Sequence, residues 1–290
     1  MVALVGLAVS GSNAAARPQP ARILFDDFSY ATPQQLAAHW IARTEPGWPG
    51  IRGGRWSADN VSLDHGVLRL TSSTDGTAAG TSETQVCHER KYLAGTYATR
   101  VRFRDTPSVG PDGDTIVETF YAISPLQAPL DPEYGELDFE YLPNGGWDTA
   151  APTLYVTSWE TASIDPWIPV NAHTSTVASL DGWHVLVVQV GQGKVRFFVD
   201  GRLRATDREP YYPKVPMSIN YNLWFSGFGS VQAGPLRRYE EDVDWVFHRA
   251  GAPLSPAQVA SEVATLRRGG VRYRDTVPPD DPPLESPCNF

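Results

Sequence analysis

The chain has 290 residues, of which 41% are hydrophobic and 11% aromatic, enough to bury a sizeable core in one large domain or two smaller ones. Its 24 Lys and Arg residues are outnumbered by 33 Asp and Glu residues, which gives a formal net charge of -9. This charge argues against nucleic acid or an acidic membrane face as a partner and favours a neutral or apolar ligand. We expect a monomer.

The first 22 residues predict a secretory signal peptide. An apolar run leads into an A-x-A pattern at residues 14–16, although no Lys or Arg precedes the run. At about ten residues the run is too short to cross a bilayer of ~30 Å, and no later segment is long enough. We therefore expect a secreted protein without a membrane span. A frayed apolar N-terminus is the alternative.

Residues 23–250 carry mainly strand patterns of period two, bounded by Gly, Asp and Pro. In residues 95–104, GTYATRVRFR, three arginines alternate with apolar residues and threonine, as in a half-buried strand. Residues 183–206 predict three strands joined by tight turns at 191–193 and at Asp200-Gly201. We predict one all-β sandwich of these strands.

The loop at residues 108–114, SVGPDGD, is rich in turn residues and acids. Its oxygen ligands could hold calcium, but a plain loop is the commoner interpretation of such spacing. The six histidines form no H-x-H or H-E-x-x-H pattern, so we predict no catalytic metal and no required cofactor. The absence of a G-x-S-x-G pattern likewise argues against serine hydrolase chemistry.

The segment 132–147, PEYGELDFEYLPNGGW, places an acid at every second position. In a strand, Glu136, Asp138 and Glu140 therefore share one face, while the apolar residues between them share the other. A solvated acidic face is the plainer interpretation, and neighbouring cations would normally support it. Residues 105–193 contain thirteen Asp or Glu and no Lys or Arg. We therefore expect repulsion to raise the pKa of at least one of the three acids, as a general acid requires.

The spacing of the acids suits glycoside hydrolysis. Four residues at ~3.4 Å each separate the Cα atoms of Glu136 and Glu140 by about 13 Å. Long side chains that lean inward would bring the two carboxylates toward the roughly 5 to 5.5 Å of a retaining mechanism. The shorter Asp138 between them would hold a proton or hydrogen-bond the nucleophile.

Aromatic residues near the acids, or in other strand-like segments, suggest a sugar-binding surface because flat rings stack on the apolar faces of sugars. They are Tyr121, Tyr134, Trp147, Trp159, Trp167 and Trp224. In residues 217–227, MSINYNLWFSG, Asn220 and Asn222 alternate with apolar residues and would offer amides to hydroxyl groups. The predicted substrate-binding residues are Tyr121, Tyr134, Trp147, Trp159, Asn222 and Trp224. Core packing is the alternative for each ring.

Residues 251–290 predict a short helix and a Pro-rich strap packed on the domain. Ser255 can cap the helix, and Val259, Val263 and Leu266 recur at helical spacing after it.

The two cysteines of the chain, Cys87 and Cys288, have no metal-ligand spacing around them. An exported protein would pair them, which would pin the C-terminal tail to the body of the domain. In the chain-entropy model, closing so long a loop is worth about 5 kcal/mol.

The segment that carries the three acids, together with four other segments, resembles a known family. GELDFEYL, residues 135–142, is similar to the E-[ILV]-D-x-E signature of family 16 glycoside hydrolases, in the form without the extra residue of laminarinase-type members. Other segments resemble the family in the same order: LAGTYATRVRF (93–103), DGWHVLVVQVGQGKVRFFVDG (181–201), MSINYNLWFSG (217–227) and EEDVDWV (240–246). The resemblance covers residues 25–247.

The resemblance implies a β-jelly-roll of two antiparallel sheets, with a glycan lying along a cleft on the concave face. It also implies a retaining, double-displacement mechanism, for which two carboxylates with separated pKa values are suited. By position, Glu136 would be the nucleophile, Glu140 the general acid and then base, and Asp138 the residue that tunes the nucleophile. A structural calcium ion, as in some members, is compatible with the resemblance.

Departures from the family pattern leave the substrate open. Tyr134-Gly135 stands where lichenase-like members have Trp-Asp, and LYVTSW, residues 154–159, stands where they have NYYTNG. The last forty residues have no counterpart. The signature without the extra residue favours mixed-linkage β-glucanases and xyloglucan-active enzymes.

Three functions follow from this sequence. The favoured one is a secreted, endo-acting glycoside hydrolase that cleaves internal β-linkages of a glucan-type polysaccharide. A glycan-binding protein on the same fold would have no need of a paired acid and nucleophile. A transglycosylase would pass the glycosyl group to a sugar hydroxyl instead of water.

Overall fold

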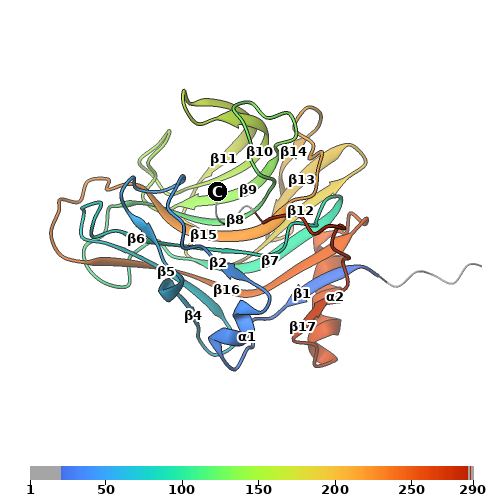
Figure 1. The fold of residues 1–290 in the computed structure, drawn as a ribbon. Coiled ribbons are helices and arrows are strands. Elements are labelled where there is room, and N and C mark those ends of the chain that lie inside the picture. The colour runs from blue at the N-terminus through green and yellow to red at the C-terminus, as the bar shows by residue number, and fades with distance from the viewer. Residues whose placement is uncertain (1–20, 287, 289–290) are drawn as a thin grey trace, which may run out of the picture.

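The computed structural model describes residues 21–286 and 288. The predicted signal peptide, residues 1–22, lies outside the described residues except for its last two positions. Two curved, packed layers of strands make up the protein, with a helix against the outer face of one layer (Figure 1). None of the helices in the described part of the chain is long and apolar enough to cross a membrane.

The first layer, here called the cleft sheet, has the spatial order β11-β10-β9-β8-β15-β6-β2. Its strands are β2 (Ile41–Ala42), β6 (Ser82–Cys87), β8 (Thr115–Ile123), β9 (Glu136–Leu142), β10 (Thr153–Ser163), β11 (Ile168–Val177) and β15 (Ser218–Gly227). All pairings in this order are antiparallel.

The second layer, the outer sheet, has the order β14-β13-β12-β7-β16, and β16 continues to β5 and β1. Its strands are β1 (Ile23–Asp26), β3 (Arg55–Trp56), β4 (Val61–Leu63), β5 (Leu68–Thr74), β7 (Gly95–Phe103), β12 (Gly182–Gly191), β13 (Lys194–Val199), β14 (Arg202–Asp207), β16 (Arg237–Ala250) and β17 (Tyr273–Asp275). Apart from the short parallel contact of β3 with β6, these pairings are antiparallel too. The predicted sandwich of two antiparallel sheets is confirmed.

Alternation of side chains explains how each strand joins the core. In β7, the residues predicted for the buried face, Tyr97, Thr99, Val101 and Phe103, are at most 1% exposed. The tight turns follow the predicted chemistry as well, because Asp200 and Gly201, between β13 and β14, have φ values of 49° and 77°. The local sequence therefore sets both the faces of these strands and their connections.

The C-terminal segment packs on the outer sheet. Helix α2 (Pro256–Arg268) begins with a capping box between Ser255 and Gln258, and it buries Val259, Val263 and Leu266 against the sheet. A second, short helix, α1 (Pro33–Ala37), and a 3-10 turn at Ala58–Asn60 lie in N-terminal connections. The predicted short C-terminal helix is confirmed.

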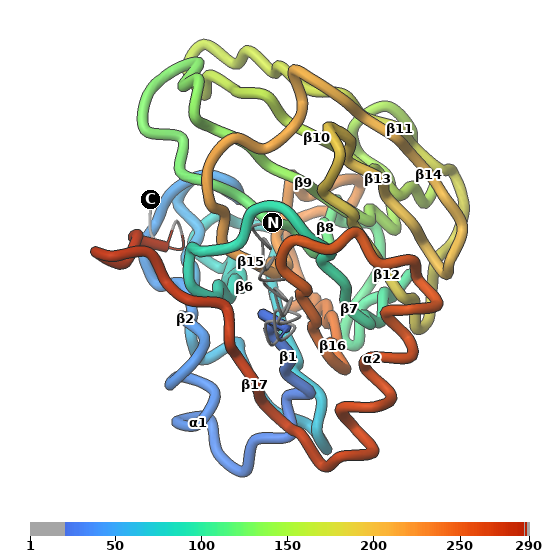
Figure 2. Tube along the Cα trace, turned by 90° about the vertical axis from the view of Figure 1, so that its right-hand side faces the viewer, coloured from blue at the N-terminus to red at the C-terminus, as the bar shows by residue number. Residues whose placement is uncertain are grey.

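The tail returns to the body of the domain through a disulfide bond. In Figure 2 the chain runs from α2 past β17 to the neighbourhood of β2. Cys288 is bonded there to Cys87 at the end of β6, with Cα atoms 5.6 Å apart and a sequence separation of 201. The predicted pairing is confirmed.

Candidate active site

Strand β9 lies in the middle of the cleft sheet, between β8 and β10, and pairs with both in unbroken register. Its odd-numbered residues Leu137, Phe139 and Tyr141 are at most 2% exposed and pack in the core between the sheets. Because side chains alternate along a strand, the three acids face away from that core. The period-two pattern of the sequence thus puts the acids on the free face of the sheet.

Neighbouring strands place a partner on each side of every acid. Glu136 lies between Ile123 and Trp159, Asp138 between Tyr121 and Thr157, and Glu140 between Thr119 and Tyr155. All of these residues belong to β8 or β10, and register alone brings them to the same face as the acids.

A pocket on this face collects most of the predicted site. It is lined by seven predicted residues, Tyr121, Glu136, Asp138, Glu140, Trp159, Asn222 and Trp224, and also by Trp48, Pro49, Gln85, Thr119 and Ile123. Trp147 lines an adjoining cavity that shares Glu140, and Tyr134 lines another that shares Glu136. The structure therefore brings every predicted catalytic and substrate-binding residue to one cleft, although Trp224 is only 8% exposed and packs largely in the wall.

Hydrogen bonds orient the acids and their neighbours. The Tyr134 hydroxyl donates to Glu136 Oε2, and the Trp159 indole nitrogen donates to Asp138 Oδ2 over 2.8 Å. Asn222 donates through Nδ2 to the Tyr121 hydroxyl over 3.3 Å. Asn220, expected beside Asn222, instead bonds to Ser218 and does not line the pocket.

Burial makes these carboxyl groups hold protons near neutral pH. It raises the pKa of Glu136 to about 7, against the opposing effect of the Tyr134 hydroxyl and an Asp138 hydrogen bond. Burial and the charge of Glu136 raise the pKa of Glu140 to about 8. Burial and the charges of both glutamates raise the pKa of Asp138 well above its usual range. Within the described residues, no Lys, Arg or His forms an ion pair with any of the three.

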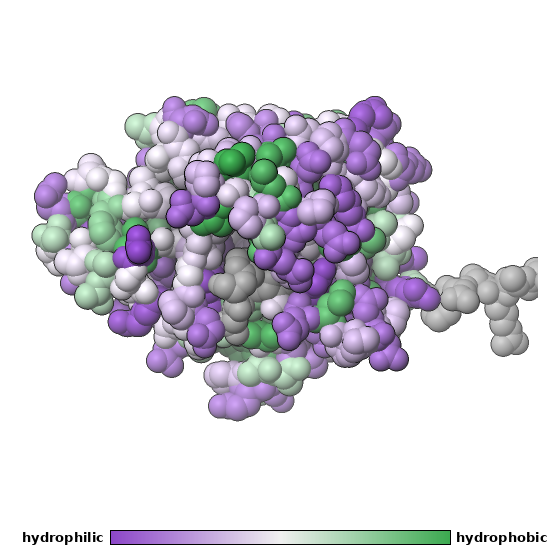
Figure 3. Space-filling view, turned by 45° about the horizontal axis from the view of Figure 1, so that its top comes forward, coloured by the Kyte–Doolittle hydropathy of each residue, from purple (hydrophilic) through white to green (hydrophobic). Residues whose placement is uncertain are grey.

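Trp48 is a site residue that sequence reasoning missed. Its ring lies 5.8 Å from that of Trp167, in the connection between β10 and β11, and the Trp167 ring lies 5.9 Å from that of Trp159. Trp48 and Trp167 are 46% and 50% exposed. The signal was present in EPGWPG, residues 45–50, where Gly and Pro surround a lone Trp as in an exposed loop. Apolar side chains gather in a patch on the face shown in Figure 3, among largely hydrophilic neighbours.

The loop that carries Trp48 is anchored below the cleft by two buried charged residues. Arg43 donates to Gln85 Oε1 over 2.9 Å and to the Trp48 carbonyl over 3.3 Å. Glu83, whose pKa burial raises to about 7, lies against Gly50 so closely that a Cβ there would sit 2.4 Å from its Oε2 atom. Gly50 also has φ +112°, which disfavours other residues.

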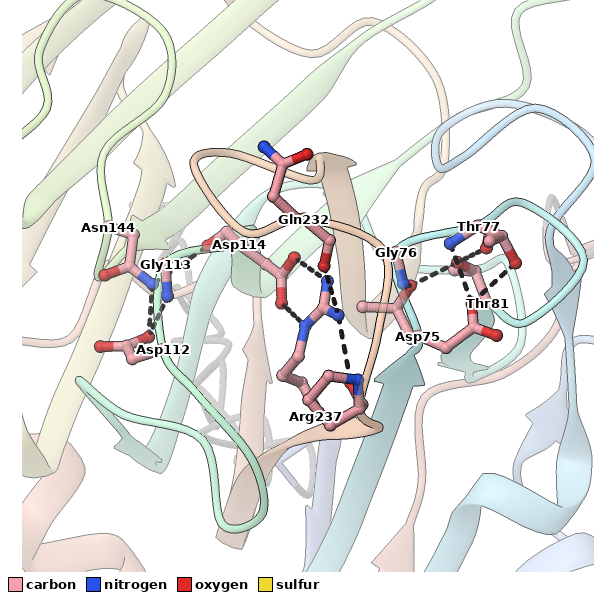
Figure 4. A network of polar contacts seen from close by, with 12 residues as sticks. Asp75, Gly76, Thr77, Thr81, Asp112, Gly113, Asp114, Asn144, Gln232 and Arg237 are labelled. Carbon is pink, nitrogen blue, oxygen red and sulfur yellow. Dashed lines mark hydrogen bonds and ion pairs between the residues drawn. The ribbon is translucent and has the colours of Figure 1, made fainter.

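A second polar network fixes the loops beyond Trp147 (Figure 4). Arg237 and Asp114, both fully buried, form an ion pair with two hydrogen bonds, of 2.7 Å and 2.9 Å. In the loop considered for calcium, Asp112 accepts hydrogen bonds from the Gly113 backbone and from Asn144 Nδ2. Donors from the chain itself therefore bond to these two carboxylates, and they link the β7–β8 connection to the β9–β10 connection and to the start of β16.

The cleft sheet of this jelly-roll sandwich thus carries grouped carboxyl groups and aromatic rings on its free face. The family model described as Glycosyl hydrolases family 16 matches residues 53–246, which is more than half of the chain. The chain belongs to this family.

Solved structures share the fold at low sequence identity. A β-glucanase from Bacillus licheniformis is 17% identical, with a TM-score of 0.57, over 79% of this chain and 99% of that one. A β-1,3-1,4-glucanase (lichenase) from a mouse hindgut metagenome is 18% identical, with a TM-score of 0.57, over 80% of this chain and 100% of that one. The laminarinase catalytic domain from Thermotoga maritima MSB8 is 17% identical, with a TM-score of 0.55, over 78% and 96%. No curated protein sequence matched.

Proposed function

We propose that this protein is a secreted, endo-acting, retaining glycoside hydrolase that cleaves internal β-glycosidic bonds of a β-glucan-type polysaccharide. The observation that carries the proposal is the position of three carboxyl groups with raised pKa values on the cleft face of one strand, among aromatic rings. Membership of family 16 and the glucanase and laminarinase names of its structural neighbours support the reaction class and substrate class.

In the proposed first step, the Glu136 carboxylate attacks the anomeric carbon and forms a glycosyl–enzyme ester. Glu140 gives its proton to the departing glycosidic oxygen, so the leaving sugar departs with a hydroxyl group. In the second step the Glu140 carboxylate takes a proton from water, whose oxygen displaces Glu136 from the anomeric carbon. Two inversions retain the configuration at that carbon.

The electrostatics of the site suit these two roles. The pKa of Glu140 is raised to about 8, so the group is largely protonated at neutral pH, as a general acid must be. The Tyr134 hydroxyl favours the charged form of Glu136, as a nucleophile requires. Asp138, hydrogen-bonded by Trp159, lies between them and would exchange a proton with Glu136 as charge develops and disappears there.

The shape of the cleft supports endo action on a polymer. The acid pocket opens at both ends of the row of acids, and on the Glu140 side a larger cavity with rings and polar groups continues from it, so the chain of a polymer can extend along the cleft from the cleaved bond. Trp147 and Trp224 on the Glu140 side offer stacking surfaces, and Asn171 offers an amide to hydroxyl groups. Secretion is part of the proposal because of the N-terminal signal pattern and the disulfide bond. The mechanism requires no cofactor.

The test is reducing-sugar release from barley mixed-linkage glucan, laminarin, xyloglucan, agarose and carrageenan. We expect release from at least one polymer by the wild-type protein and almost none by Glu136→Gln with an unchanged circular dichroism spectrum. A fully active Glu136→Gln protein would refute the assignment of the nucleophile. A change in the distribution of polymer chain lengths without any release of new reducing ends would identify a transglycosylase. Binding of a polymer in affinity electrophoresis without any turnover would identify a glycan-binding protein.

A further inference from the structure

The two cavities beside the acids differ in chemistry. On the Glu140 side, a cavity of about 470 Å³ combines aromatic rings with polar groups, among them Asp148, Asn171 and His173. On the Glu136 side, a cavity of about 190 Å³, here called the apolar chamber, has Ile123, Leu126, Ala162 and Ile164 in its wall. The first cavity combines flat rings with several hydrogen-bonding groups, which suits sugars. The second is lined by four aliphatic side chains, four aromatic rings and Glu136, so its wall is mainly apolar.

The apolar chamber is a poor site for an unmodified sugar unit. A sugar hydroxyl that loses its water without gaining a partner costs free energy, and aliphatic side chains offer no partner. Apart from the indole N–H groups of Trp48 and Trp167 at the rim, the polar side chains in the chamber lining are Tyr134 and Glu136, and the Tyr134 hydroxyl already donates to Glu136. Trp159 also lines the chamber, but its indole nitrogen donates to Asp138.

The chamber is built into the sheet and is open at its rim. Ile123 and Tyr134 are each 4% exposed and pack together with Leu126 and Trp159. At the rim, Ile164, Trp48 and Trp167 are 41%, 46% and 50% exposed, and the two indole rings lie 5.8 Å apart. A group entering the chamber would bury these apolar surfaces, which an empty chamber leaves in contact with water.

We propose that the apolar chamber binds a short aliphatic substituent, an O-alkyl ether or O-acyl ester, on the sugar unit beside Glu136. This inference rests on the proposed hydrolase function and narrows its substrate class to a substituted polysaccharide. The chamber adjoins the acid pocket through Glu136, Trp48 and Trp159, so a substituent there belongs to a sugar next to the reaction centre. Each CH₂ group that it buries adds about fourfold to affinity.

The first experiment compares kcat/KM on an O-acetylated β-linked polysaccharide and on the same polymer after mild alkaline deacetylation. We expect the wild-type protein to prefer the acetylated form several-fold. Ile164→Ser removes part of the aliphatic rim and should reduce that preference. Ile168→Ser is the matched control, because Ile168 is also 41% exposed, follows the same connection between β10 and β11, and does not line the chamber. It should retain the wild-type preference.

A binding experiment separates failure of this inference from failure of the proposed function. Affinities for methyl and butyl β-D-glucoside are measured by quenching of tryptophan fluorescence in the wild-type, Ile164→Ser and Ile168→Ser proteins. Tighter binding of the butyl compound that is weakened only by Ile164→Ser supports the chamber even if no polymer is hydrolysed. Hydrolysis of both polymers at equal kcat/KM, with equal binding of the two glucosides, overturns the inference and leaves the hydrolase assignment intact.

Discussion

The indole nitrogen of Trp159, in β10, donates a hydrogen bond of 2.8 Å to Asp138 Oδ2 in the neighbouring strand β9. This bond favours the charged form of Asp138 and opposes the effects of burial and of the two flanking glutamates. Trp159 also lines the acid pocket and both adjoining cavities. A single side chain therefore links the protonation of the acids to the shape of the cleft.

Replacing Trp159 by phenylalanine should lower kcat. The ring is largely kept, but the hydrogen bond to Asp138 is lost and the pKa of Asp138 rises further. A bond to a charged group is worth about 1.5–3 kcal/mol, so we expect a loss of roughly tenfold or more. The measurement is steady-state kinetics on the best polymer, with Trp167→Phe as the comparison because that ring packs on Trp159. Trp167→Phe should act mainly on KM, and equal losses of kcat in both variants would contradict this role for Trp159.

The pH dependence of activity should be bell-shaped with its optimum near neutrality. Protonation of Glu136, whose pKa is about 7, removes the nucleophile on the acid side. Ionisation of Glu140, whose pKa is about 8, removes the general acid on the alkaline side. Because the three acids interact, the limbs report the group of acids and not single residues. The measurement is kcat/KM from about pH 4 to about pH 10.

The electrostatic interaction between Glu136 and Glu140 can also be tested directly by titration. The charge of Glu136 helps to raise the pKa of Glu140, so Glu136→Gln should lower the pKa of Glu140. Carboxyl carbon shifts in NMR spectra follow that titration in the wild-type and Glu136→Gln proteins. In the pH profile of kcat/KM described above, an optimum below about pH 5 would be inconsistent with raised pKa values at both glutamates.

Glu140→Gln should stabilise the folded protein at alkaline pH. The pKa of Glu140 is raised from 4.5 to about 8, so the folded state binds this proton more tightly than the unfolded chain does. The stability that this group contributes is complete at pH values below its pKa in the unfolded chain. It is lost as the pH rises through about 8, the pKa of the group in the folded protein. Glutamine does not ionise, so the gain in Tm over the wild-type protein should grow between about pH 5 and about pH 9. Each kcal/mol of unfolding free energy gained corresponds to a rise in Tm of roughly 2–4 °C.

Thermal unfolding followed by circular dichroism at several pH values checks this prediction. Glu133→Gln is the matched control, because Glu133 is exposed in the connection just before β9. Its Tm should follow that of the wild-type protein at every pH. A gain for Glu140→Gln that does not vary with pH would point to packing instead of ionisation.

Removing the disulfide bond should destabilise the fold without abolishing activity at room temperature. Cys87 and Cys288 are separated by 201 positions in sequence, and closing so long a loop is worth about 5 kcal/mol in the chain-entropy model. Cys288→Ala should therefore lower the urea midpoint strongly, and added reductant should lower the wild-type midpoint but not that of the variant. Equal midpoints for the oxidised wild type and the variant would show that the bond contributes no stability.

The sequence alone determined the features that depend on local backbone geometry. Alternation in a strand puts Glu136, Asp138 and Glu140 on one face whatever the rest of the chain does. The turn at Asp200-Gly201 and the capping box at Ser255 depend likewise on a few neighbouring residues. The order of segments that resemble family 16 pointed to the same fold as the family model and the solved structures.

Only the tertiary structure decided what surrounds the acids. Register between strands places Trp159 beside Glu136, and it leaves Asn220 bonded to Ser218, away from the pocket. Trp48 reaches the cleft from a loop about 90 residues before the acids, held by long-range contacts of Arg43 and Glu83 that no local pattern encodes. The raised pKa values of the acids and the apolar wall on the Glu136 side have the same origin, because burial and packing are properties of the assembled sheets.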